Sequence, residues 1–292
     1  MTMTPDEYCQ ERAASSGSSF YYSFLFLPAE QRRAITALYA FCREVDDVVD
    51  ECRDASVAQN KLIWWREELE RTYHGEPQHP VGQALQPIIE QFAMPQEELL
   101  EIIDGMEMDL VQQRYASFNE LRLYCHRVAG VVGLLAAEIF GYEDRHTRKY
   151  ADALGLALQL TNILRDLRED AERGRIYIPE DELQKFGVTA EDLRRPQASE
   201  RVEKLLQFQA ERALQCYHDA YALLPPDDRY RQRTGLVMAA IYEALLHEII
   251  DGGYKVLEGR TSISPLRKLW IAWKTMQHEK RQHKRLMRRQ HA

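Results

Sequence analysis

The sequence predicts an all-α protein that forms one domain over residues 1–292. Its 292 residues include only 14 Gly and 11 Pro, and the β-branched alternation typical of strands is scarce. Apolar residues instead recur at three- and four-residue steps along most of the chain. Hydrophobic residues make up 45% and charged residues 29% of the chain, as in soluble globular proteins. A chain of this length can bury a large core, and no repeat or linker divides it.

The predicted helices follow one another along the chain. The first covers residues 29–53, where apolar positions from Ile35 to Val49 fall at helical spacing. The second covers 56–73 and ends before the Gly75-Glu76-Pro77 break. Further helices are predicted over 82–93, 96–112, 117–139, 144–171, 199–223, 232–257 and 265–288. Residues 173–200 are predicted to be irregular, in a suitable position for a flap over a site.

The formal net charge of −8 is unevenly distributed. Residues 265–292 contain nine Lys or Arg and one acid, Glu279, so the tail carries +8 and the rest about −16. An acidic body repels phosphate backbones, so we expect no nucleic-acid partner. The basic tail is predicted to be a helix that is either solvated or docked on an anionic membrane surface. Trp270 and Trp273 stand at its start, and either interpretation is compatible with them.

The cysteines and the N-terminus predict a cytoplasmic protein. Five cysteines, an odd number without a C-x-x-C pair, indicate a reduced chain without disulfides or a zinc site. The N-terminal residues lack the basic and apolar regions of a signal peptide. The longest apolar run, Val128 to Ala137, is too short to cross a bilayer. We therefore expect any membrane contact to be peripheral, at the inner face of the cytoplasmic membrane.

Two acidic clusters about 120 residues apart are the main candidates for a functional site. They are Asp46-Asp47-Val48-Val49-Asp50-Glu51 and Asp166-Leu167-Arg168-Glu169-Asp170. Carboxylates four residues apart on a helix point the same way, and two such pairs across a cavity would suit Mg²⁺ and a phosphate-bearing substrate. The first cluster ends its predicted helix, which is unfavourable for the helix dipole unless a cation compensates. Arg43, one turn earlier, is either a salt-bridge partner or a phosphate ligand.

The second cluster extends a polar stripe on its predicted helix. Gln159, Asn162, Asp166 and Asp170 recur at steps of three, four and four residues, and the opposite face is apolar. Neutral amides beside carboxylates favour an oxygen-ligand site over a solvated surface, which would more often show Glu and Lys pairs.

Other features leave two interpretations open. Gly130 and Gly133 interrupt a helical pattern, which indicates either close helix packing or a smooth wall for a hydrophobic ligand. The aromatic residues from Phe20 to Phe26, with Tyr39 and Phe41, are either ordinary core or a pocket that stabilises a carbocation. Neither a dinucleotide G-x-G-x-x-G nor a Walker motif is present, so nucleotide binding has no support.

Several motifs together resemble the squalene/phytoene synthase family, from about Ser15 to Leu269. They are Ser18-Ser19-Phe20-Tyr21-Tyr22 before Leu27-Pro28, Tyr39 to Asp50, Tyr124 to Gly133, and Gln159 to Asp170 with Gly174-Arg175-Ile176-Tyr177. The resemblance implies the isoprenoid synthase fold, a single all-α domain with a deep central cavity. It also implies that the two aspartate-rich helices face each other.

The resemblance also assigns roles to individual residues. The implied Mg²⁺ ligands, with Mn²⁺ as a substitute, are Asp46, Asp50, Asn162, Asp166 and Asp170. The implied substrate-binding residues are Ser19, Phe20, Phe24, Gln159, Arg165 and Arg267. The implied catalytic residues are Tyr39, Arg43, Tyr124, Tyr177 and Tyr242.

Within the family, the first two motifs are most similar to bacterial presqualene diphosphate synthases. That similarity implies head-to-head condensation of two farnesyl diphosphates without NADPH, and hopanoid-pathway enzymes as downstream partners. Phytoene, squalene or dehydrosqualene synthesis is an alternative within the family. Because Asp46-Asp47-x-x-Asp50 also fits head-to-tail prenyl diphosphate synthases and terpene cyclases, these are a second alternative. A non-catalytic helical scaffold is a third.

Overall fold

A computed structural model describes residues 3–15, 19–52 and 54–290 of the protein. The described residues form helices and contain no β-strand beyond an isolated bridge between Arg114 and Ile176. The helices are α1 (Pro5–Ser15), α2 (Ser19–Phe24), α3 (Ala29–Glu51), α4 (Ala55–Tyr73), α5 (Pro80–Gln91), α6 (Gln96–Val111), α7 (Phe118–Cys125), α8 (Val131–Phe140), α9 (His146–Arg165), α10 (Leu167–Glu172), α11 (Glu180–Phe186), α12 (Glu200–Leu223), α13 (Arg233–Asp251) and α14 (Pro265–Gln290). The predicted all-α fold is confirmed.

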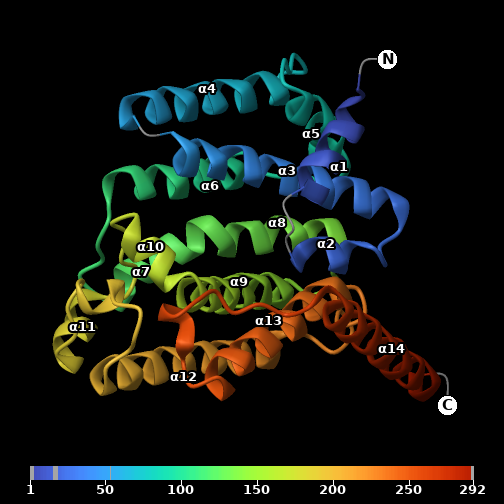
Figure 1. Ribbon diagram of the computed structural model, residues 1–292. Coiled ribbons are helices and arrows are strands. Elements are labelled where there is room, and N and C mark those ends of the chain that lie inside the picture. Colours follow the sequence, from blue (N-terminus) through green and yellow to red (C-terminus); the bar gives the residue numbers. More distant parts are fainter. Residues whose placement is uncertain (1–2, 16–18, 53, 291–292) are drawn as a thin grey trace.

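The helices stack in layers around two hydrophobic clusters (Figure 1). One cluster gathers side chains from α9, α12 and α13, and the other gathers side chains from α3 to α6. Phe20, Val128 and Met238 are half-buried and pack against both clusters. All three also line the main cavity. The cavity therefore lies where the two halves of the core meet.

One wall of this cavity is a helical stretch with an unusual turn. α7 and α8 are joined by a π-helical segment, His126–Gly130, so that Phe118–Phe140 is continuously helical. By length and composition this stretch could cross a membrane. Its longest apolar run, Val128 to Ala137, is shorter than the roughly 20 apolar residues that a membrane-spanning helix needs. It packs between α6 and α9 and contributes Val128, Val132 and Gly133 to the cavity wall. Such packing is typical of a core helix.

The observed helices differ from the predicted ones in several places. The short helix α2 was not predicted, and α13 ends at Asp251 rather than at the predicted residue 257. The sequence pattern did not indicate α1, which buries only Cys9 and Ala13. Ion pairs from Arg12 to Glu44 and Asp47 hold α1 against α3 instead. The predicted helix 144–171 is broken at Asp166, and the irregular stretch 173–200 contains the short helix α11.

Candidate active site

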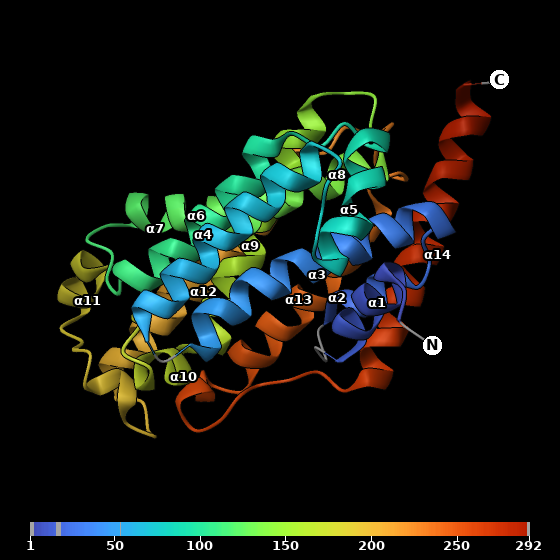
Figure 2. The ribbon, with the colours of Figure 1, turned by 90° about the horizontal axis from the view of Figure 1, so that it is seen from above.

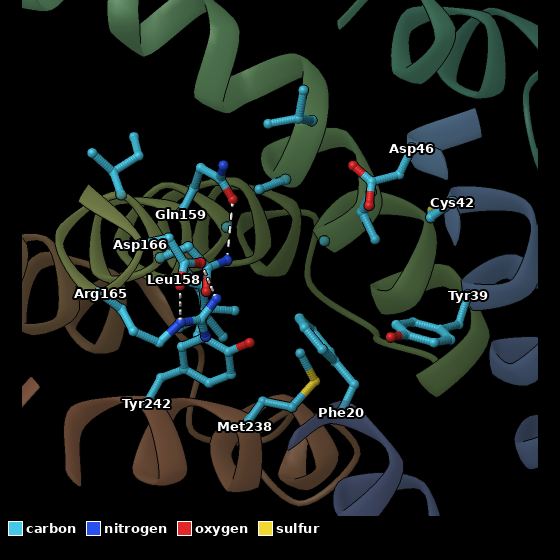
Figure 3. A pocket seen from close by; sticks show the side chains of 18 of the residues that line it. Phe20, Tyr39, Cys42, Asp46, Leu158, Gln159, Arg165, Asp166, Met238 and Tyr242 are labelled. Carbon is cyan, nitrogen blue, oxygen red and sulfur yellow. Dashed lines mark hydrogen bonds and ion pairs between the residues drawn. The ribbon is translucent and has the colours of Figure 1, made fainter. Parts of the chain in front are cut away.

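A cavity of about 580 Å³ occupies the centre of the protein, and most of the predicted site residues line it. Side chains from α3 face those from α9 and α13 across the cavity (Figure 3). The predicted residues that line it are Phe20, Phe24, Tyr39, Arg43, Asp46, Asp50, Tyr124, Gln159, Asn162, Arg165, Asp166, Asp170, Tyr177 and Tyr242. The side chain of Ser19 lies outside the described part of the structure.

The carboxylates of the first acidic cluster are separated by the helix they occupy. Asp46 and Asp50 line the cavity, whereas Asp47 turns away from it and pairs with Arg12 and Arg43 at 2.5 Å each. Arg43 Nη1 also lies 2.6 Å from Asp46 Oδ2. Burial, followed by repulsion from Asp50, raises the pKa of Asp46 to about 7. Arginine side chains thus supply the cations that the C-terminal end of α3 requires.

The second cluster keeps its polar stripe although the helix breaks within it. Asp166, with φ −98° and ψ 8°, separates α9 from α10. Backbone hydrogen bonds from Asp166 N to Asn162 O and from Asp170 N to Asp166 O, each 2.9 Å, continue across the break. The side chains of all three residues therefore still line the cavity. Burial, followed by repulsion from Asp166, raises the pKa of Asp170 to about 7.

The amides of the stripe leave one oxygen without a partner. Asn162 Nδ2 donates to Gln159 Oε1 at 3.2 Å. Asn162 Oδ1 is buried and accepts no hydrogen bond from the described part of the chain. An unpaired buried oxygen is costly, and it lies beside Asp166 on the stripe. It is therefore available to a ligand in the cavity.

The segment after the second cluster reaches across the cavity to the first. Arg175 Nη1 lies 2.8 Å from Asp50 Oδ1, and Arg173 Nη1 lies 3.2 Å from Asp50 Oδ2. Arg175 also donates to Val49 O at 3.2 Å. Arg173 and Arg175 therefore close one side of the site, at the start of the segment where a flap was predicted.

Three cations converge near Asp166. Arg165 and Arg260 both pair with the Asp166 carboxylate, and Lys268 lines the same part of the cavity. Burial, together with Arg165 and Arg260, lowers the pKa of Lys268. Such a concentration of positive charge favours binding of an anion. Neither Arg260 nor Lys268 was predicted, since both follow irregular backbone far from any motif.

Arg267 requires a correction. It was expected to contact a diphosphate, but it does not line the cavity. Its guanidinium is about half exposed and pairs with Glu248 on α13. Adjacent residues on a helix point about 100° apart, so the neighbouring Lys268 faces inward instead.

A buried carboxylate that the sequence analysis missed lies deeper in the cavity. Asp109 on α6 accepts hydrogen bonds from the hydroxyls of Tyr124 and Tyr177, each 2.8 Å long. Burial raises the pKa of Asp109 to about 6, although Arg175 and the two tyrosines oppose that shift. The rings of Tyr115, Tyr124 and Tyr177 pack together beside it. Asp109 alternates with Glu107 among apolar residues at the end of α6, and nothing in the sequence distinguishes the buried acid from the one that pairs with Arg66.

The other end of the cavity is aromatic and apolar. The Phe20 ring lies 5.8 Å from the Tyr39 ring and 5.7 Å from the Tyr242 ring, between centroids. Met238 and Phe140 extend this lining. The cavity therefore has a charged end and a hydrocarbon-like end, which suits an amphiphilic ligand with an anionic head.

Close helix packing, the first interpretation of the helical glycines, is confirmed for Gly133. A β-carbon at Gly133 on α8 would lie 2.4 Å from Ala151 O, and one at Gly155 on α9 would lie 2.5 Å from Ala129 O. The two helices therefore approach each other at a distance that only glycine permits. Gly133 and Gly155 also line the cavity, so close packing produces a smooth wall there.

The sequence of this chain matches a known protein family. A sequence profile of the family described as squalene/phytoene synthase matches residues 13–267. The chain belongs to this family. Members of the squalene/phytoene synthase family condense isoprenoid diphosphates, which accords with a cavity that has one charged and one apolar end.

The individual relatives are named as synthases of different products. The chain is 36% identical over 279 residues to a phytoene synthase of Arthrospira platensis, covering 90% of this chain and 89% of that one. It is 34% identical over 248 residues to a presqualene diphosphate synthase of Sinorhizobium fredii, covering 85% and 88%.

Solved structures of the family share the fold. A dehydrosqualene synthase superposes with a TM-score of 0.85 at 28% identity, covering 94% of this chain and 96% of that one. Squalene synthase HpnC from Alicyclobacillus acidocaldarius superposes with a TM-score of 0.76 at 33% identity, covering 86% and 94%. The isoprenoid synthase fold expected from the sequence is confirmed.

Proposed function

We propose that this enzyme condenses two molecules of farnesyl diphosphate head to head into presqualene diphosphate, with Mg²⁺ as cofactor. The observation that carries the proposal is the polarity of the cavity. Asp46 faces Asp166 across the charged end (Figure 3), Asp50 and Asp170 also line the cavity, and aromatic side chains line the other end. Two diphosphate heads would bind at the charged end and two hydrocarbon chains at the apolar end.

The donors present fit Mg²⁺. All of them are oxygens, from four carboxylates and from the unpaired Oδ1 atom of Asn162. Hard cations prefer oxygen ligands. In the described part of the chain, no three His, Cys, Asp or Glu side chains converge closely enough to enclose a metal by themselves. Each facing pair would therefore fill only part of an octahedral shell, leaving positions for water and phosphate oxygens. When bound, Mg²⁺ would neutralise the diphosphates and assist departure of one of them.

The protein's own side chains would handle the charge that develops. As the C1–O bond of one donor breaks, diphosphate departs with the electron pair, and Arg165, Arg260 and Lys268 would hold it. The double bond of the second donor then forms a bond to that C1. Loss of one proton closes the cyclopropane, and the second donor keeps its diphosphate. Phe20, Tyr39 and Tyr242 present aromatic faces that would stabilise the intermediate cation.

Phytoene synthesis is the second candidate, because phytoene synthases are as similar to this chain as the presqualene diphosphate synthase is. Mass analysis of products from farnesyl or geranylgeranyl diphosphate, each with and without NADPH, separates the candidates. We expect turnover of farnesyl diphosphate to presqualene diphosphate, unchanged by NADPH. Preferential conversion of geranylgeranyl diphosphate to phytoene would overturn the proposed product. Chain elongation that requires isopentenyl diphosphate would indicate head-to-tail synthesis instead.

Two substitutions test the site itself. Asp46→Asn and Asp166→Asn should each reduce turnover to background while helicity is retained. Asp104→Asn is the matched control, since this residue lies outside the cavity and pairs with Arg66. Full activity in either cavity variant would refute the assignment. Omission of divalent cations should also abolish turnover, and Mn²⁺ should restore part of it.

A further inference from the structure

The outward face of α14 is apolar at its start and basic beyond it. Leu266, Leu269, Trp270 and Trp273 follow each other at helical spacing and form one stripe, which we call the α14 stripe. Leu266 is 80% exposed, Trp270 55% and Trp273 54%. Large apolar side chains this exposed and contiguous indicate a surface that another partner covers.

Cations continue the α14 stripe along the same face. Lys280, Lys284 and Arg288 follow Trp273 at steps of seven, four and four residues, and all three are exposed. The only acid of this helix, Glu279, is buried on the opposite face and bonds Arg229 at 2.8 and 2.9 Å. Within the described part of α14, the outward face therefore presents basic side chains without an acid.

The far half of α14 is also geometrically accessible. Its inner face packs on α13, but the C-terminal part extends beyond the body of the protein (Figure 2). α2 packs against α14, and exposed Leu25 and Phe26 follow α2. Lys268, two positions after Leu266, lines the cavity. The outward face thus begins next to the charged end of the cavity.

We propose that α14 docks this protein on an anionic lipid membrane, with the α14 stripe inserted at the interface and its basic half on the lipid headgroups. One face of α14 carries leucine and tryptophan at its start and lysine and arginine at its far end. A helix with such a face matches the chemistry of an anionic membrane surface. Tryptophan is favoured at the boundary between headgroups and acyl chains. Anionic lipids attract nearby basic residues, whereas the acidic body of the protein is repelled and stays in water.

Vesicle binding by the full-length protein tests this proposal without reference to catalysis. The protein should co-sediment with phosphatidylcholine vesicles that contain phosphatidylglycerol, and binding should weaken as salt is raised. Trp270→Glu/Trp273→Glu should abolish binding, and Lys280→Glu/Lys284→Glu should weaken it by about fivefold or more per charge. The matched control is Lys61→Glu/Ile63→Glu, which alters an exposed lysine and an exposed isoleucine on α4 and should bind as wild type.

Two further readouts keep the test decisive. Brominated phosphatidylglycerol should quench tryptophan fluorescence of the wild type, and Trp270→Glu/Trp273→Glu should lose that quenching while retaining its thermal unfolding midpoint. Equal binding to pure phosphatidylcholine, or wild-type binding by both α14 variants, would refute the proposal. A vesicle-free dimer that dissociates in Trp270→Glu/Trp273→Glu would show that a second copy covers the α14 stripe, and would overturn it too.

Discussion

Arg175 and Asp50 join the two acidic motifs, since Arg175 Nη1 lies 2.8 Å from Asp50 Oδ1 although 125 residues separate them in sequence. Burial disfavours the charged form of Arg175, but Asp50 and Asp109 stabilise it. The guanidinium therefore compensates the repulsion between carboxylates that approach each other from α3, α6 and α10. It also lines the cavity.

Replacement of this cation should impair the enzyme more than it impairs the fold. Arg175→Gln should lower kcat/KM by about 10–100-fold, the effect of losing a charged hydrogen bond. Arg173→Gln is the matched control, because Arg173 also pairs with Asp50 but is about half exposed, so water screens its charge. Steady-state kinetics on farnesyl diphosphate measure both. Equal losses in the two variants would contradict a special role for Arg175.

The raised pKa values of Asp46 and Asp170 predict how stability depends on pH. Both lie at about 7, compared with an ordinary value of 3.8, so between pH 4 and 7 the native state binds more protons than the unfolded state. Without divalent cation, stability should therefore be fully present at low pH and fall as pH rises through this window. Partial exposure of Asp46 screens the effect to about 1 kcal/mol, or about 1.5–2 °C in the unfolding midpoint of a chain this long.

Mg²⁺ should reverse the loss of stability at high pH, since it binds the ionised carboxylates. The increase in midpoint caused by Mg²⁺ with inorganic diphosphate should be larger at pH 8 than at pH 5. Asp46→Asn should be more stable than wild type at pH 8 without Mg²⁺ and should gain less when the ligands are added. Thermal scans at the two pH values measure these differences. An equal gain at pH 5 and pH 8 would contradict the prediction.

Most of the predicted site residues line the cavity, because the motifs that contain them repeat polar residues at helical spacing. Asp46, Asp50 and the stripe from Gln159 to Asp170 could be recognised in this way. Asp109 and Lys268 could not, since each is a single polar residue that tertiary packing alone brings to the site. The same holds for α1, whose position depends on ion pairs with α3 rather than on an apolar face. A local sequence pattern shows which residues share a helix face. It does not show which distant segments come into contact, because tertiary packing decides that.

Asp109 should depend on both of its tyrosine donors. Tyr124→Phe or Tyr177→Phe leaves one carboxylate oxygen unpaired, which should cost about 1–3 kcal/mol of unfolding free energy. The double variant should be non-additive, because the two hydroxyls donate to the two oxygens of one carboxylate and also contact each other. Tyr115→Phe is the matched control, since its buried hydroxyl has no partner among the described residues and its removal should be neutral or stabilising. Denaturant unfolding measures all four proteins. A destabilised Tyr115→Phe would contradict this account.

Gly133→Ala should separate α8 from α9. The new β-carbon would lie 2.4 Å from Ala151 O, a backbone atom that cannot rotate away. We expect a loss of about 1–3 kcal/mol from overpacking, only partly offset by the better helix propensity of alanine. Gly130→Ala should cost less, because its β-carbon meets the Asp152 side chain, which is partly exposed and can turn. Thermal unfolding ranks the two variants, and the reverse order would refute the packing argument.

Lys268 and Arg267 are neighbours on α14, but only Lys268 is expected to matter for substrate binding. Lys268 lines the cavity beside Arg165 and Arg260, and repulsion from these two contributes to its lowered pKa. A diphosphate at this position would relieve the repulsion, so Lys268→Ala should raise KM for farnesyl diphosphate by about tenfold or more. Arg267→Ala should leave KM within about twofold of wild type, because its partner is Glu248 outside the cavity and exposed ion pairs contribute little. Since both substitutions remove one charge from the same helix turn, a general electrostatic effect would shift KM equally. A larger effect of Arg267→Ala would restore the role that sequence resemblance assigned to it and remove Lys268 from the diphosphate site.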